Sequence, residues 1–525
     1  MLHRTYIRYL GVFLKRKLNM TNKGELLFEE SDSDWDFPLL EKIWETVDDI
    51  GKNTLGFDYY DAQIEIISSE QMIDNYSTHA LPQMYNHWSF GKSFVQNDNA
   101  YKTGQQGLAY EVVINTNPSI AYLMENNTAT MQALVLAHAS VGHSGFFKTN
   151  YLFTGWTDAD SILGYLSFAK SYISQCEEKH GKLRVECLLD AAHALQLHGV
   201  DKYKKPLASV KKSDRQKLER EKHEEESFAD IWRTASPVPK SKPSIFGEED
   251  WGDWGAEQVN EKEENLLLYI ETHSPSLEQW ERNILGIVRK IAQYFYPQRQ
   301  TSLMNEGFAC MSHHTIMTEM FDRGNISAGS YLEFLTSHSG VVYQPGYDSK
   351  HYSGINIYAL GYAMMRDIRR MCTSPDKEDM IWFPEICNTD WRETIQHVVA
   401  NYRDESFVAQ FLSPKIIRDF GLFTLDIDND LSYHLVSATH DDDDVHSIRA
   451  SLSGQYDLSK RVPQIEVSGF DKEGDRTLNI VHTVRDGVTL DYRSARNVVH
   501  HIYSLWGFPV NLEYRDENGV RVESI

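Results

Sequence analysis

Two histidines at the end of an almost entirely apolar segment are the first residues whose types and spacing could do chemistry. His138 and His143 close the stretch MQALVLAHASVGH, which predicts a buried helix because it offers almost no polar surface. Two imidazoles against a buried wall suit metal ligation in a dry pocket. On a regular α-helix, residues five apart point about 140° away from each other. Gly142 could loosen the last turn and swing His143 toward His138; two hydrogen-bonded histidines at a helix end are the alternative.

A second candidate lies on a predicted helix from about 183 to 198. Spacings of four and three residues place Glu186, Asp190 and His193 on one face of that helix. The pair Asp190 and His193 has the carboxylate-x-x-His form that helical metal sites use. His193 also lies in the apolar run AAHAL. A solvated polar stripe is the alternative interpretation.

The third candidate is Glu306, in the mostly apolar segment MNEGFA. A carboxylate in such surroundings needs a partner, which could be a metal ion or an arginine. His313 follows seven residues later, about 10 Å along a helix, so it could support the ligands but not share the ion. We predict that His138, His143 and Glu306 converge on one divalent metal ion, with Asp190 and His193 nearby. Zinc is the first choice, and iron or manganese are alternatives.

Loops rich in aromatic, glycine and amide side chains are weaker candidates. The stretch HWSFGK and the segment from Tyr347 to Gly361 are of this kind, and such loops often line ligand clefts. Simple aromatic packing is the alternative. The residues that we expect to line a cleft or to support the ligands are His313, His87, Trp88, Glu111, Tyr352 and Asn356.

The elements that must position these residues are mainly helical. Strand-like segments such as AQIEIIS and AYEVVIN occur between about 61 and 118, and helices dominate from about 119 to 200 and from about 265 to 419. The segment 203–263 alternates Lys and Glu runs, then prolines, then an acidic tryptophan stretch. It predicts a charged flexible insertion that folding does not require.

The end of the chain has a different pattern. PQIEVSGF and TLNIVHTV alternate like strands, SARNVVHHIYSLWG is an amphipathic helix, and FPVNLEYRDENGVRVES predicts a hairpin. The fold class is therefore α+β: a mainly helical large domain with a few strands at 21–450, and a small C-terminal ββαββ domain at 455–525. Residues 1–20 are interpreted as a non-native or disordered extension, with a short basic membrane-surface anchor as the alternative.

Composition excludes several classes of protein. The 525 residues carry a net charge of −24, which disfavours a general nucleic-acid binder because phosphates require a basic surface. The five scattered cysteines contain no C-x-x-C pair and favour reduced thiols in a cytoplasmic protein. Apolar runs are too short for stable membrane insertion, and no phosphate-binding or dinucleotide-binding motif is present.

Several long segments together resemble the SpoVR family. They include SEQMIDNYSTHALPQMYNHWSFGKSF, GQQGLAYEVVINTNPSIAYLMENNTATMQALVLAHASVGH, QYFYPQRQTSLMNEGFA and ESFVAQFLSPKIIRDF, in family order over most of residues 37–525. The resemblance implies a link to spore cortex formation, or to stationary-phase and starvation responses. It also implies partnership with a PrkA-type serine kinase and a von Willebrand factor A-like protein. Ser312, His313 and His314 stand where a more aromatic stretch is expected, which weakens a role for His314 more than for His313.

Three functional hypotheses remain open at this level. A looser analogy to zincin-like metallopeptidases assigns His138, His143 and Glu306 as ligands of a metal-dependent hydrolase. No glutamate follows His138, so nothing obvious in the sequence activates a water molecule. The alternative is a non-enzymatic regulatory partner of the kinase and the von Willebrand factor A-like protein, and a third option is a redox or oxygen-handling metal site.

Overall fold

The computed structural model describes most of the chain in two compact units. They comprise Met1–Val185 with Phe295–Arg461, and Glu186–Tyr294 with Val462–Ile525. The expected insertion at 203–263 and the expected extension at 1–20 lie outside the described residues. The residues described are 25–29, 35–78, 84–103, 111–200, 265–426, 435–438, 444–472, 474–484, 487–516 and 519–524.

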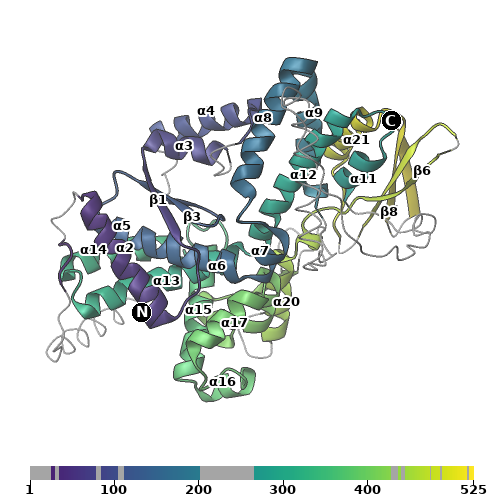
Figure 1. Ribbon diagram of the computed structural model, residues 1–525. Coiled ribbons are helices and arrows are strands. Elements are labelled where there is room, and N and C mark those ends of the chain that lie inside the picture. Colours follow the sequence, from purple (N-terminus) through teal and green to yellow (C-terminus); the bar gives the residue numbers. More distant parts are fainter. Residues whose placement is uncertain are drawn as a thin grey trace, which may run out of the picture. The chain divides into compact units, whose positions relative to one another are not determined.

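A small sheet lies in the first unit (Figure 1). Its order is β1-β3-β2, formed by β1 (Ala62–Ile67), β3 (Ser119–Met124) and β2 (Glu111–Ile114). Strand β3 is the central strand, parallel to β1 and antiparallel to β2, and all six of its residues are buried. Strand β2 begins with Glu111, which pairs with Leu123 across the ladder.

A continuous helix follows the sheet and changes its winding in the middle. It consists of α5 (Ala129–Val135), the π-helical segment η3 (Leu136–His143) and α6 (Ser144–Thr149). All residues from α5 through η3 are buried. Its main neighbour is α13 (Ser302–Arg323), and α14 (Ala328–Val341) contacts its first part, α5. Helix α13 in turn packs against α15 (Ile357–Thr373). The buried core of this unit is therefore mostly helix packed on helix.

Glycines allow two of these helix pairs to approach closely. A Cβ atom on Gly142 would lie 2.6 Å from the Cα atom of Ala309, which brings η3 against α13. A Cβ atom on Gly307 would lie 2.5 Å from the carbonyl carbon of Gly361, which brings α13 against α15. Neither contact leaves room for a side chain, so the glycines set the spacing of the three elements.

The N-terminus of α13 is held by a carboxylate from another helix. Asp404 accepts hydrogen bonds from the backbone N–H groups of Leu303 and Met304, both at 2.9 Å. Its carboxylate therefore satisfies donors that a helix leaves free in its first turn. The bond fixes the start of α13, the helix that carries Glu306 and His313.

The other elements of the first unit surround this core. They are α2 (Phe37–Asp49), η2 (Ile50–Leu55), α3 (Ser69–Ser77), α4 (Trp88–Lys102), α7 (Tyr151–Trp156), α8 (Ile162–His180), α16 (Lys377–Trp382), α17 (Trp391–Asn401), α18 (Asp404–Phe411), α19 (Pro414–Phe420), β4 (Thr424–Asp426), β5 (Leu435–Ala438), α20 (Val445–Tyr456) and η6 (Leu458–Lys460). Helix α2 begins after Asp36, which caps it, with a proline in the first turn.

The second unit contains the expected ββαββ arrangement. The order along the chain is β6 (Glu466–Phe470), β7 (Leu478–Thr483), α21 (Tyr492–Trp506), β8 (Val510–Asp516) and β9 (Gly519–Ser524). The strands form one sheet in the order β6-β7-β8-β9, with β7 parallel to β8 and the outer pairs antiparallel. The mainly helical α+β class with a small C-terminal module is confirmed.

Helices from the middle of the chain belong to this second unit. It takes in most of α9 (Lys182–Ala194) and α12 (Gln279–Gln300), together with η4 (Gln196–His198) and α11 (Leu266–His273). Ser274, just after α11, donates a hydrogen bond to the carbonyl of Leu505 at 2.9 Å, and Tyr269 stacks on Trp506. The described residues 186–200 and 265–294 therefore group with the C-terminal module. No helix among the described residues is long and apolar enough to cross a bilayer.

Candidate metal centre

The π-helical winding of η3 places His138 and His143 on one face. In a π-helix the backbone hydrogen bonds join residues five apart, so these residues lie above one another. The two ring centroids are 4.6 Å apart. The α-helical separation assumed from the sequence does not apply, because the whole segment from Leu136 is wound this way. Such segments are rare and occur often at functional sites.

Two carboxylates face these histidines, from β2 and from α13. The Nε2 atom of His138 lies 3.5 Å from Glu111 Oε1 and 3.5 Å from Glu306 Oε2, and the Nε2 atom of His143 lies 3.6 Å from Glu306 Oε2. These separations exceed ordinary hydrogen-bond lengths. They are close to the roughly 3.4 Å that separates two ligands of a tetrahedral ion with bonds of about 2.1 Å. The three nitrogen–oxygen separations therefore suit ligands of one cation, and the ligand atoms of Glu111, His138 and His143 all lie within 4.8 Å of one another.

The site is more open on its carboxylate side. The side chains of Glu111 and Glu306 keep 17% and 20% of their surface exposed, whereas those of His138 and His143 keep 7% and 8%. The imidazoles thus form a buried wall, and the carboxylates lie nearer to solvent.

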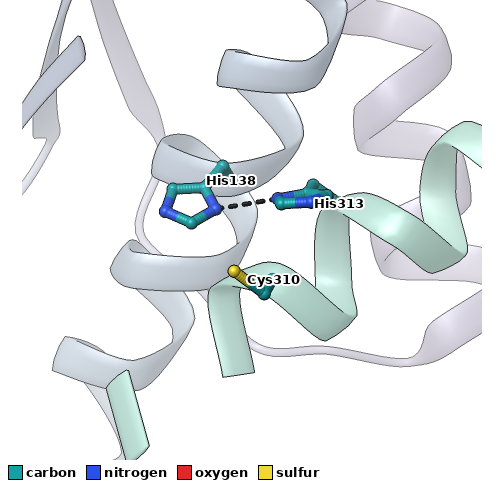
Figure 2. Close-up of side chains that lie close together, drawn as sticks. All are labelled: His138, Cys310 and His313. Carbon is teal, nitrogen blue, oxygen red and sulfur yellow. Dashed lines mark hydrogen bonds between the residues drawn. The ribbon is translucent and has the colours of Figure 1, made fainter. Parts of the chain in front are cut away.

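A row of imidazoles continues from the opposite edge of His138. Its Nδ1 atom lies 2.8 Å from the Nδ1 atom of His313, as Figure 2 shows. The Nε2 atom of His313 lies 2.7 Å from the Nδ1 atom of His338 on α14. We call His138, His313 and His338 the histidine row. A neutral imidazole has one donor and one acceptor, so the row can run in a single direction.

Cys310 lies close to the start of this row (Figure 2). Cys310, His138 and His313 form a second group whose ligand atoms lie within 4.8 Å of one another. However, the short Nδ1–Nδ1 distance requires a shared proton, so His138 and His313 cannot both offer those lone pairs to an ion. Burial also raises the pKa of the Cys310 thiol, which opposes the thiolate form that metals bind. The carboxylate side of His138 is the better metal site.

The pKa values of the two carboxyl groups move in opposite directions. Burial raises the pKa of Glu111 to about 7, with His138 acting against the rise and Glu306 adding to it. Burial also disfavours ionised Glu306, but His143, His138 and Tyr358 outweigh it and lower its pKa. Glu306 is thus the ionised carboxylate, and Glu111 is the one that can exchange a proton near neutral pH.

The pKa values of the histidines also move in opposite directions. Burial opposes a charge on His138, but Glu111, Cys310 and Glu306 together outweigh it and raise the His138 pKa well above its ordinary value. Burial lowers the pKa of His143, and it lowers that of His313 strongly. Burial lowers the pKa of His338 to about 3. The far end of the histidine row is therefore neutral.

Two further residues orient the candidate ligands. His143 donates its Nδ1–H to the side-chain oxygen of Asn305 at 2.9 Å, which leaves its Nε2 lone pair on the carboxylate side. Tyr358 makes a side-chain hydrogen bond to Glu306, and burial keeps this phenol protonated by raising its pKa. Asn356 accepts a hydrogen bond from the backbone N–H of Tyr358 at 3.0 Å. Asn356 therefore caps α15 and positions Tyr358, without touching the centre.

The structure does not bring every predicted residue into this centre. Asp190 and His193 belong to the second unit, on the half-buried edge of α9, whose buried residues are apolar. The predicted residues do share one face of α9, but that face borders the buried, apolar side of the helix. Among the described residues, the groups that could hold a metal include neither of them.

The predicted aromatic segments contribute Tyr358 to the centre, because it lies between Tyr347 and Gly361 and bonds to Glu306, but their other named residues make contacts elsewhere. His87 caps α4 through its bond to the backbone N–H of Ser89, and Trp88 is 51% exposed. Tyr352 packs against Tyr347. These loops show the simple aromatic packing and capping that the sequence left as the alternative. Of the expected cleft residues, Glu111 and His313 contact His138.

Three contributing residues were missed at the sequence level: Cys310, Asn305 and His338. Tyr358 was not named, although it lies in the predicted segment from Tyr347 to Gly361. Cys310 stands four residues after Glu306, so helical spacing puts it on the same face of the helix. Asn305 is the residue directly before Glu306. His338 and Tyr358 come from two other helices. No spacing rule along the chain relates them to the centre.

Comparison with known proteins places the chain in a family. The model of the SpoVR like protein family matches residues 34–461, and that of the SpoVR-like C-terminal domain matches residues 463–517. The uncharacterized protein YcgB of Escherichia coli (strain K12) is 48% identical over 487 residues, which cover 93% of this chain and 94% of that protein. No solved structure matches the chain. Because the matches span nearly all of its length, the chain belongs to the SpoVR family.

Proposed function

We propose that this protein is a metal-dependent hydrolase whose centre is formed by His138, His143, Glu306 and Glu111. In this proposal the two histidines and Glu306 hold a divalent cation, with zinc as the first choice. Two histidines and a glutamate are a ligand set that catalytic zinc sites use. A cation held there supplies Lewis acidity toward a water molecule and a substrate oxygen.

The observation that carries the proposal is the position and protonation of Glu111. The sequence offers no glutamate after His138 to serve as a base. Glu111 approaches the centre from β2 instead, with its Oε1 atom 3.5 Å from the Nε2 atom of His138. Burial raises its pKa to about 7 in the metal-free protein. A divalent cation beside it would lower that pKa and keep Glu111 ionised, as a general base must be. We assign it the removal of a proton from the attacking water and the return of that proton to the leaving group.

The histidine row supports the ligand role of His138. With a cation at Nε2, His138 must carry its proton on Nδ1 and donate it to His313 Nδ1. His313 then donates its Nε2–H to His338. The distances of 2.8 Å and 2.7 Å suit both bonds. The row thus favours the tautomer that directs the Nε2 lone pair at the carboxylates.

The same ligand set also suits non-haem iron, because two histidines and one carboxylate can leave coordination positions open. This second candidate retains the redox hypothesis. The presence of a general base such as Glu111 favours the hydrolase over the redox site. The links to sporulation or starvation, and to a PrkA-type kinase and a von Willebrand factor A-like protein, stay predictions from the family.

The test pairs metal content with hydrolysis. Zinc-loaded wild type is assayed against a panel of chromogenic esters, peptides and phosphoesters, beside Glu111→Gln. The matched control is Glu125→Gln, which changes an exposed carboxylate just after β3. We expect Glu111→Gln to keep its zinc and to lose about 100-fold or more of the activity, as removal of a general base does. The control should match the wild type.

Three results would contradict the proposal. Loss of zinc from Glu111→Gln would make Glu111 a ligand, and full activity in that variant would remove its role as the base. A zinc-loaded wild type that hydrolyses none of the three substrate classes would remove the hydrolase assignment and leave only the metal centre.

A further inference from the structure

Three arginines gather on the first unit where α15 packs against α17. Arg366 and Arg369 stand one turn apart on α15, so they share a face of that helix. The guanidinium carbon of Arg369 lies 4.3 Å from the ring centroid of Trp391, and that of Arg392 lies 4.8 Å from the same centroid. We call Arg366, Arg369 and Arg392 the arginine patch.

The arginine patch lacks carboxylate partners. None of the ion pairs found among the described residues involves its three members, although the chain carries a net charge of −24. Arg370, the residue next to Arg369, pairs with both Asp367 and Asp379. Carboxylates are available nearby, since Asp390 accepts a hydrogen bond from the backbone N–H of Arg392 at 2.7 Å, but no ion pair among the described residues joins one to the three guanidinium groups.

Within the described part of the chain, the hydrogen bonds of the patch engage few of its donors, and Arg366 interacts with the hydroxyl of Tyr362. Arg369 donates one N–H to the hydroxyl of Thr315 at 3.4 Å, and Arg392 donates its Nε–H to the carbonyl of Thr54 at 3.1 Å. Each guanidinium has five N–H donors. Arg369 is half-buried, and burial together with Arg392 and Arg366 lowers its pKa. Like charges held together in this way are costly unless an anion joins them.

We propose that the arginine patch is a binding site for a phosphate group. Guanidinium groups bind phosphate oxygens through two parallel N–H bonds, and stacking leaves their donor edges free to do so. Trp391 covers one face of both Arg369 and Arg392 and so fixes their planes. Stacking alone explains the position of those two residues, but it gives no partner to their outward N–H groups.

The arginine patch is separate from the proposed catalytic carboxylates. Arg366 lies over Tyr362, with its guanidinium carbon 5.5 Å from the ring centroid, and Tyr362 lies against His338, the last member of the histidine row. A phosphate bound here would therefore lie beyond the neutral end of that row. The proposal does not depend on a metal or on hydrolysis.

The test measures thermal unfolding in inorganic phosphate, with chloride at equal ionic strength as the reference and a chelator to exclude phosphate on a metal. The variants are Arg369→Gln with Arg392→Gln, and Arg366→Gln. Arg323→Gln is the control, because Arg323 pairs with Asp49 and Glu319. We expect phosphate to raise the melting temperature of the wild type and of the control. The double variant should lose this rise.

Arg366→Gln keeps the experiment decisive if the double variant does not fold, because Arg366 is exposed and its replacement should not disturb packing. It should weaken phosphate binding about tenfold, as loss of one charge-assisted contact does. The proposal is overturned if the wild type gains nothing from phosphate beyond chloride, or if a folded double variant gains as much as the wild type. Unchanged affinity in Arg366→Gln would overturn it equally.

Discussion

The two ring nitrogens of His138 face two regions that differ in almost every respect. On the Nε2 side, Glu111, Glu306 and His143 converge at separations of 3.5–3.6 Å between nitrogen and oxygen atoms. On the Nδ1 side, His313 and His338 continue a row with separations of 2.8 Å and 2.7 Å. The first region is partly exposed and acidic, and the second is buried and neutral.

This difference shows how the same side chain obtains two roles from its neighbours. Separations that are too long for hydrogen bonds but suit ligands of one ion leave room for a cation. Separations at hydrogen-bond length leave no such room, and they fix the orientation and tautomer of the ring. We therefore assign metal binding to the carboxylate side and positioning to the histidine row.

The largest effect should come from removing charge on the carboxylate side. Glu306→Gln keeps the size of the side chain but replaces a carboxylate by an amide, which is a poor ligand for a divalent cation. Zinc affinity should fall by more than about 100-fold, beyond the usual cost of losing a supporting residue. Isothermal titration with zinc measures this, with Glu125→Gln as the control. An unchanged affinity in folded Glu306→Gln would remove Glu306 from the ligand set.

A smaller effect should follow from a change in the histidine row. His313→Asn removes the partner of His138 Nδ1 but leaves all four residues of the carboxylate side in place. Zinc affinity should fall about 10–100-fold, the usual cost of losing a residue that orients a ligand. His314→Asn, its neighbour outside the hydrogen bonds of the row, should bind zinc like the wild type. Equal losses in both variants would mean general damage to α13.

The packing that holds the two regions together can be tested through a glycine. Gly307→Ala puts a methyl group 2.5 Å from the carbonyl carbon of Gly361, so α13 and α15 must move apart. The free energy of unfolding should fall by about 1–3 kcal/mol, as overpacking usually causes. Gly164→Ala on α8 is the matched control, since nothing lies within 4 Å of the added atom. It should be neutral or stabilise by up to about 1 kcal/mol. Denaturant titration of both variants decides the matter.

The neutral state of His338 should affect how the free energy of unfolding depends on pH. Burial lowers the pKa of His338 from 6.5 to about 3. Between these values the unfolded chain binds a proton at His338 that the folded chain does not, so the free energy of unfolding falls as the pH falls. The contribution is about 1.4 kcal/mol per pH unit.

His338→Asn should flatten the slope of stability against pH by that amount between about pH 6 and 4.5. The control is His397→Asn, which replaces an exposed histidine on α17 and should leave the slope unchanged. Denaturant unfolding at several pH values measures both. An unaltered slope in His338→Asn would show that His338 is not held neutral in the folded protein.

Local patterns along the chain were enough to predict part of this architecture. Alternating and amphipathic segments predicted the C-terminal ββαββ order, and the apolar stretch around His138 predicted a buried helix. Glu306 was singled out because an acid among apolar residues needs a partner, and the structure places it 3.5 Å from His138. These inferences rest on neighbours within one element, which spacing describes well.

What the sequence could not supply depends on contacts between elements. The π-helical winding arises where η3 packs closely on α13, so the α-helical angle between His138 and His143 was the wrong measure. Glu111 lies on a strand that is separated along the chain from the helices it faces, and burial between these elements raises its pKa. The face of α9 with Asp190 met every spacing rule, but it packs in the other unit.

The most direct test of the account is X-ray absorption spectroscopy at the zinc edge of the zinc-loaded protein. If the carboxylate side of His138 holds the ion, the first shell contains only nitrogen and oxygen atoms at about 2.0–2.2 Å, and Glu306→Gln loses the bound zinc. If the ion lies on the other side, between Cys310 and the histidine row, a sulfur atom appears at about 2.3 Å. A sulfur ligand, or a wild type that binds no zinc, would contradict the assignment of His138, His143, Glu306 and Glu111 as a metal centre.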